Sequence, residues 1–183
     1  MAVEEAPPPL PPPPAAIPAV SSMVNFHNRA AVRIALLMAG VSSMLGLIPL
    51  GPILSSFWWL IVMVSAGFVS VYVYHRQTGE FLNVRNGMRI GWMTGLFNFI
   101  ILLILTTAAA VALSDKGGLS GVYREQLERS GAMTADMQEA LKVLESPTGF
   151  AMVVMTALIF VFILFTLLPM VGGALGAKVL EKE

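Results

Sequence analysis

The stretch IGWMTGLFNFIILLILTTAAAVAL occupies residues 90–113 and contains no acidic or basic side chain. A helix needs about 20 apolar residues to cross the roughly 30 Å hydrocarbon layer of a bilayer, so this stretch is long enough to span one. Similar runs occupy residues 31–50, 53–74 and 150–171, and Arg33 is the only charged residue within them. The sequence therefore predicts an all-α, polytopic membrane protein with four transmembrane helices.

The composition of the chain supports this interpretation. Hydrophobic residues make up 56% of the 183 residues and charged residues 12%, whereas a soluble globular domain carries about 25% charged residues. The formal net charge is zero, so charge indicates no nucleic-acid partner. The chain contains no cysteine, which excludes disulfides, thiolate metal sites and cysteine nucleophiles. We expect the lipid bilayer to be the main partner, and we expect no cofactor.

The N-terminal segment differs from the rest of the chain in its proline content. Residues 1–20 hold 8 of the 12 prolines, a density that excludes helices and favours extended polyproline II structure. We predict a disordered, proline-rich tail over residues 1–28, followed by a four-helix transmembrane domain over residues 29–180. A semi-rigid spacer is favoured for the tail, and a ligand for an adaptor domain with an aromatic groove is the alternative.

The third connection, residues 114–148, is the longest polar region after the tail. Its apolar residues recur at helical spacing, Thr134 has the position of an N-cap, and Ser146 and Pro147 end the pattern. We predict two short amphipathic helices that lie on the membrane surface or over the bundle. The alternative is that these helices form a lid that grips a ligand.

Basic residues are distributed unevenly between the two sides that four spans define. The side without the termini has a longer, net-acidic loop. Short, positively charged segments remain in the cytoplasm. Both termini are therefore predicted to be cytoplasmic, with Arg29, Arg33, His75, Arg76, Arg85 and Arg89 in contact with lipid head groups. The side with both termini holds seven basic residues: Arg29, Arg33, Arg76, Arg85, Arg89, Lys178 and Lys182.

Small residues form stripes on the predicted helices. Gly87, Gly91 and Gly95 recur every four residues at the start of the third span, and Gly172 and Gly176 follow the fourth. Because lipid supplies no hydrophobic drive for helix association, such stripes let helix backbones pack closely. The sequence does not distinguish packing within one subunit from packing between subunits.

Two polar residues lie within the third span. Asn98 and Thr94 are four residues apart, and the amide of Asn98 needs a partner inside the bundle. A single interhelical hydrogen bond is favoured, and a solute or proton path that also uses Thr106 and Thr107 is the alternative. Pro169 lacks an amide donor, so we expect the fourth helix to end or kink near it.

The sequence contains no catalytic constellation within its spans, so we expect no enzyme. An enzyme would need a site in the third connection, for example one in which Asp115, Glu125 and Asp136 hold a divalent ion. The spacing of these acids resembles no known metal-binding loop.

Three segments of the chain resemble a known type of protein: VYHRQTG (residues 73–79), RNGMRIGWMTG (residues 85–95) and GGALG (residues 172–176). Together they resemble parts of small bacterial four-span membrane proteins of unknown function, of a type found in acidobacteria. Some of those proteins place a zinc ribbon before a proline-rich linker, and this chain, without cysteine, lacks the ribbon. The resemblance covers about residues 25–180. It implies the architecture and a bacterial inner membrane, and it implies no activity.

These observations favour a non-enzymatic integral membrane protein that acts through helix packing, as a homo-oligomer or as an accessory subunit of a membrane-protein partner. The alternative is a small transporter or channel component with a polar path near Asn98.

Overall fold

The computed structural model describes residues 24–48, 52–80, 82–112 and 146–181. These residues form helices and no strand: α1 (Arg29–Gly46), α2 (Pro52–Thr78), α3 (Val84–Ala112) and α6 (Pro147–Leu180). All four helices are long and apolar enough to cross a membrane, which confirms the predicted all-α, four-span architecture. Most of the predicted tail, and the third connection over residues 114–145, lie outside the described residues.

Local interactions define where the helices begin and end. The Oδ1 atom of Asn28 accepts a hydrogen bond from the amide of Ala31 at 3.2 Å and caps α1. Ser146 caps α6 in the same way, because its Oγ atom accepts a hydrogen bond from the amide of Gly149 at 3.1 Å. Such caps satisfy amide groups that have no partner in the first turn. Gly79 ends α2 with a φ of 68°, a left-handed conformation that glycine adopts readily.

The helix bounds differ from the sequence-based expectation at three places. α1 ends at Gly46, before residue 50. The predicted connection over residues 75–89 is mostly helical, because α2 continues to Thr78 and α3 begins at Val84. The expectation that the fourth helix ends near Pro169 is wrong, since α6 continues through this residue to Leu180. Proline is tolerated inside a membrane helix where neighbouring helices accommodate the carbonyl group that loses its partner.

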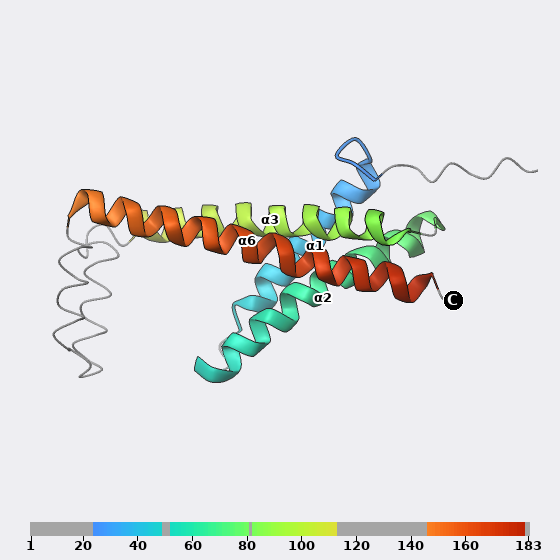
Figure 1. Ribbon diagram of the computed structural model, residues 1–183, viewed down its shortest axis with the longest axis horizontal. Coiled ribbons are helices and arrows are strands. Elements are labelled where there is room, and N and C mark those ends of the chain that lie inside the picture. Colours follow the sequence, from blue (N-terminus) through green and yellow to red (C-terminus); the bar gives the residue numbers. More distant parts are fainter. Residues whose placement is uncertain (1–23, 49–51, 81, 113–145, 182–183) are drawn as a thin grey trace, which may run out of the picture.

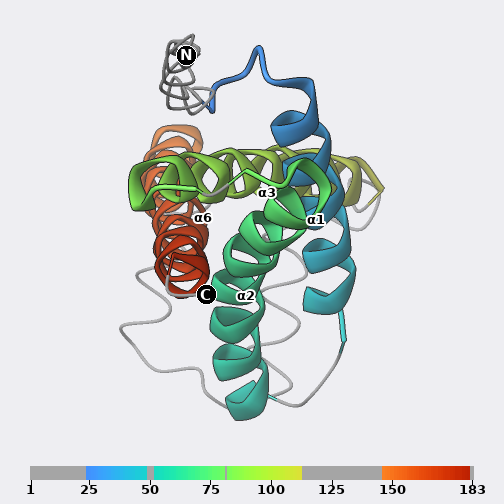
Figure 2. The ribbon, with the colours of Figure 1, turned by 90° about the vertical axis from the view of Figure 1, so that its right-hand side faces the viewer.

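The helices cross one another at one end of the molecule. In Figure 1, α3 and α6 both extend along the longest axis, while α1 and α2 run obliquely to it; the turned view of Figure 2 shows that α3 is also inclined to α6. Figure 2 shows α1 and α2 next to each other, with α3 crossing them. At about 1.5 Å per residue, the 29 residues of α3 extend about 43 Å and the 34 residues of α6 about 51 Å. Both helices exceed the roughly 30 Å hydrocarbon layer.

The buried core lies at one end of the molecule, where α1 and α3 begin and α2 and α6 end. We call this region the packed end. Beyond it, the C-terminal part of α3 (residues 100–112) and the N-terminal part of α6 (residues 147–161) extend past α1 and α2 (Figure 1). We call these two segments the arms. The core cluster of the packed end comprises Val24, Ala31, Ile34, Ala35, Val71, Tyr74, Leu82, Ile90, Met93, Ala177 and Leu180.

Candidate functional site

Glycines of α3 bring its backbone into contact with α6. A Cβ atom built at Gly91 would collide with the carbonyl oxygen of Pro169, and one built at Gly95 would collide with that of Phe165. A Cβ atom at Gly87 would lie 2.5 Å from the carbonyl oxygen of Gly173, closer than real Cβ atoms approach. The predicted stripe on α3 therefore meets successive turns of α6 within one chain, and we call this contact the glycine seam.

The residues of α6 at the seam also approach α2. A Cβ atom at Gly172 would collide with the carbonyl oxygen of Val64, and one at Gly67 would collide with that of Pro169. Gly176 is less tight, because its Cβ atom would lie 3.1 Å from the carbonyl oxygen of Phe68. The C-terminal half of α6 thus packs between α2 and α3. Sequence reasoning missed the role of Gly67, although an isolated glycine in the middle of a span was a signal for it.

Pro169 explains why one of the carbonyl groups of α6 at the seam, that of Phe165, lacks its usual helical partner. In a regular helix the amide of residue 169 would donate to the carbonyl group of Phe165, and proline has no amide hydrogen. The Phe165 carbonyl oxygen instead faces the Cα atom of Gly95. Contacts between a Cα–H group and a carbonyl oxygen contribute about 0.5–1 kcal/mol each. Pro169 is itself almost fully buried, so this residue belongs to the helix contact and does not end the helix.

Asn98 connects α3 with α1 inside the bundle. Its Nδ2 atom donates to the Ser42 Oγ atom at 2.8 Å, and its Oδ1 atom accepts from the Ser43 hydroxyl at 2.7 Å. The Nδ2 atom also lies 3.7 Å from the Met63 Sδ atom of α2. With 1% of its surface exposed, Asn98 makes the interhelical hydrogen bonds that the sequence favoured. The amide therefore holds three helices together.

Thr94 forms the second polar contact, between α3 and α2. Its Oγ1 atom lies 2.9 Å from the Ser70 Oγ atom, and both side chains are buried. Each hydroxyl also lies within hydrogen-bond distance of a carbonyl oxygen one turn earlier in its own helix, at Ile90 and Ala66. Because each hydroxyl carries one proton, one of them donates to the other and the second donates to its own helix. Within the described parts of the chain, every buried side-chain nitrogen or oxygen has a hydrogen-bond partner.

Thr106 and Thr107 do not join this polar network. Both lie exposed on the arm of α3, and their hydroxyls donate to carbonyl groups of Leu102 and Leu103 in the same helix. The four polar residues proposed for a path along α3 are therefore not brought to one interior face. This separation weakens the case for a continuous polar path.

A third polar cluster ties the ends of the helices together at the packed end. The hydroxyl of Tyr74 accepts a hydrogen bond from the Nδ2 atom of Asn28 at 2.8 Å and donates to the Oε2 atom of Glu80 at 3.1 Å. The Nδ1 atom of His75 lies 2.8 Å from the carbonyl oxygen of Glu80. His75 thus holds the α2–α3 connection and is half-buried, and its contact with lipid head groups stays a prediction. Sequence reasoning missed this cluster because Asn28 is 46 residues from Tyr74 and because the contacts of Glu80 depend on how the α2–α3 connection turns back.

The basic residues predicted to meet lipid lie at the packed end, and all the arginines among them are exposed. Every charged side chain of the described residues lies at this end, and the basic ones outnumber the acidic ones. The basic residues are Arg29, Arg33, Arg76, Arg85, Arg89 and Lys178, and the acidic residues are Glu80 and Glu181.

The described residues provide no cluster of metal-binding side chains. No group of three histidine, aspartate or glutamate side chains in this part of the chain could hold a metal ion. A groove of about 190 Å³ lies between α1 and α2, and mostly apolar residues such as Met38, Leu45, Trp58 and Val69 line it. The acids Asp115, Glu125 and Asp136 lie outside the described residues.

Comparisons of the chain with protein-family models, with curated proteins and with solved structures found no match.

Proposed function

We propose that this chain is a non-enzymatic integral membrane protein that acts by helix contacts in the bilayer, as an oligomer or as an accessory subunit. The observation that supports this proposal is that the polar side chains within the spans form hydrogen bonds inside the bundle. Asn98 bonds to Ser42 and Ser43 of α1, whereas Thr94 and Ser70 lie within hydrogen-bond distance of each other and of carbonyl groups of their own helices. Such satisfied bonds hold helices together and leave no buried polar group of the described residues to receive a solute.

The glycine seam also limits where a partner can bind. Its glycines on α3 already contact α6 of the same chain, so they are not accessible to a second protein. The arms, by contrast, expose large apolar side chains: Ile104 is 63% exposed and Phe160 is 61% exposed. We infer that the contact with a partner or a second copy involves the arms.

The arm of α3 has a surface that suits another helix. The side chains of this surface repeat at intervals of four residues, which produces the ridges and grooves into which a second helix packs. The hydroxyl of Thr107 is bonded to the carbonyl group of Leu103 at 2.7 Å, so it needs no partner from outside. A shallow hollow on this surface is lined by Leu103, Ile104, Thr107, Ala108, Val111 and Ala112.

The proposed location is a bacterial inner membrane with both termini in the cytoplasm. The concentration of basic residues at the packed end supports this orientation, because positively charged segments remain on the cytoplasmic side. The arms then cross the outer half of the bilayer.

Site-specific photocrosslinking tests the proposal. A benzophenone amino acid is placed at Phe160 on the arm of α6, or at Phe57 near the start of α2 as a matched control. Both positions are phenylalanines in apolar helices, and their exposed fractions are 61% and 63%. After irradiation in the native membrane, we expect a protein adduct from position 160 and lipid adducts alone from position 57.

Mass spectrometry of the adduct separates the two forms of the proposal. An adduct with the same chain indicates a homo-oligomer, and an adduct with another membrane protein indicates an accessory subunit. Lipid adducts alone at both positions would contradict a protein contact at the arms. Solute flux through proteoliposomes that is abolished by Asn98→Leu would favour the transport alternative.

A further inference from the structure

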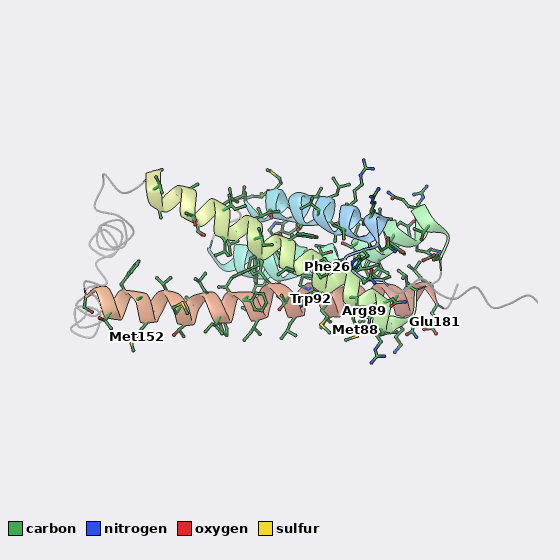
Figure 3. All side chains as sticks on the ribbon, turned by 90° about the horizontal axis from the view of Figure 1, so that it is seen from above. Phe26, Met88, Arg89, Trp92, Met152 and Glu181 are labelled. Atoms are coloured by element: carbon green, nitrogen blue, oxygen red, sulfur yellow. The ribbon has the colours of Figure 1, made fainter. Side chains whose placement is uncertain are left out.

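The segment before α1 folds across the start of α3. Val24 is fully buried, and its carbonyl oxygen lies 3.5 Å from the Nη1 atom of Arg89, which donates to it. The ring of Phe26 packs edge-on against Trp92, with 5.6 Å between ring centroids. Figure 3 shows Phe26, Arg89 and Trp92 together on one side of the packed end. An aromatic pair and a guanidinium group therefore share one exposed surface.

The basic charge on this surface has no acidic partner among the described residues. Arg85, Arg89 and Trp92 lie at positions i, i+4 and i+7 of α3, so they share one face of the helix. No ion pair joins either arginine to Glu80 or Glu181, and the first turn of α3 contains no acidic residue. Arg89 uses one N–H group on Val24, and a guanidinium group has five.

The position of Trp92 along α3 places these arginines at the membrane surface. At about 1.5 Å per residue, the helix rises about 30 Å from Trp92 to Ala112, which equals the thickness of the hydrocarbon layer. Tryptophan is enriched at the boundary between hydrocarbon and water. Arg89 then lies about 5 Å and Arg85 about 10 Å beyond this boundary along the helix axis, at the depth of the lipid phosphates.

We propose that Phe26, Arg89 and Trp92 form a binding site for an anionic phospholipid. The guanidinium group of Arg89 would hold the phosphodiester oxygens, because arginine presents paired donors that match this group. The aromatic pair would contact the glycerol and the first acyl carbons, and Arg85 would favour a head group without a positive charge. This choice of ligand follows from the local charge: a zwitterionic lipid also needs an anionic group to receive its ammonium ion, and no carboxylate of the residues that the structure describes pairs with Arg85 or Arg89.

The proposed lipid site does not rest on the proposed partner contact. The glycine seam and the lipid site belong to the packed end, whereas the protein contact is inferred for the arms. Failure of one experiment therefore leaves the other intact.

Fluorescence quenching of Trp92 by brominated lipids tests the site. The chain has three tryptophans, so Trp58→Phe and Trp59→Phe leave Trp92 as the single reporter. The full-length protein is placed in phosphatidylcholine bilayers that contain a small fraction of brominated phosphatidylglycerol or, in parallel, brominated phosphatidylcholine. We expect the anionic lipid to bind about fivefold more tightly, the preference that one arginine near the surface typically produces.

Two charge variants decide whether the preference arises from this site. Arg89→Gln removes the guanidinium group; Val24 is fully buried in the core cluster, so the contact of Phe26 with Trp92 should survive, and we expect the lipid preference to disappear. Arg76→Gln removes an equally exposed arginine from α2 at the same end and should keep the preference. No preference in the tryptophan-reporter protein, or an equal loss in both variants, would overturn the proposal, since equal loss indicates general attraction to the membrane surface.

Discussion

α3 and α6 run through both the packed end and the arms, yet their side chains face different surroundings in the two regions. Ile90 on α3 is fully buried, and Ile104, four turns later on the same helix, is 63% exposed. Hydropathy does not explain this contrast, since both residues are isoleucine in an apolar helix. In a bilayer, small residues decide which part of a helix packs against its neighbour, because lipid solvates large apolar side chains well.

The change from glycine to phenylalanine marks the boundary between the two regions. The seam positions of α3 recur every four residues, and the next position after Gly95 is Phe99. Its ring packs edge-on against Phe162 of α6, with 5.1 Å between ring centroids. Two aromatic rings between the helices keep the backbones apart, whereas at Gly95 the backbones touch. The arms begin directly beyond this aromatic pair.

The largest effect should come from adding one methyl group at the seam. In Gly91→Ala the new Cβ atom would collide with the backbone of Pro169, which cannot rotate away as a side chain can. We expect a loss of about 3 kcal/mol in the free energy of unfolding, the upper end for overpacking. Gly40→Ala is the matched control, because no atom lies within 4 Å of its added Cβ atom. Reversible unfolding in mixed micelles measures both, and equal stabilities would show that the seam is not tightly packed.

A smaller effect should separate the packed end from the arms directly. Ile90→Ala removes a fully buried side chain, and Ile104→Ala makes the same change at an exposed position of the same helix. We expect Ile90→Ala to reduce the free energy of unfolding by about 2 kcal/mol, and Ile104→Ala by less than about 0.5 kcal/mol. The same unfolding assay in micelles compares the two variants. If Ile104→Ala is the more damaging change, the arm of α3 is buried by a contact within the folded protein.

The smallest effect should come from the polar contact between α1 and α3. Asn98→Leu removes the hydrogen bonds to Ser42 and Ser43 but keeps a side chain of similar size. Interhelical hydrogen bonds in membranes contribute about 0.6–1.7 kcal/mol, so we expect a loss of about 1 kcal/mol. Thr107→Val is the control, because its hydroxyl bonds only within α3. Unfolding curves that coincide for Asn98→Leu and the unmodified chain would remove this network as a source of stability.

The sequence predicted the spans, the glycine stripe and the polar contact of Asn98, because each depends on one stretch of chain. The length of a span can be counted directly from its run of apolar residues. A side-chain amide inside a span needs a hydrogen-bond partner whichever neighbouring helix provides it. The continuation of α6 through Pro169 was not predictable in this way. Whether a proline ends a helix depends on what receives the carbonyl group it releases, and Gly95 of another helix is at that position.

Contacts between distant segments were the other part that the sequence did not reveal. The pair of Phe26 and Trp92 depends on how the segment before α1 turns over α3. The cluster of Asn28, Tyr74 and Glu80 depends on which helix ends meet. Periodicity describes the faces of a helix, but it does not identify the neighbour that each face meets.

The position of α6 between α2 and α3 has a consequence for biosynthesis. The seam residues of α6 follow the end of α3 by about 60 residues, which a ribosome that adds about 5–20 residues per second needs about 3–12 s to synthesise. During this interval the glycine face of α3 is in the membrane without its partner, while Ser42 and Asn98 are already present to pair. We therefore expect α1, α2 and α3 to associate first through their hydrogen bonds, and α6 to enter last between them. Crosslinking of cysteines placed at positions 42 and 98 in ribosome-bound chains that stop before α6 would test this order, and a missing crosslink would contradict it. Of the four described helices, α6 then completes the assembly.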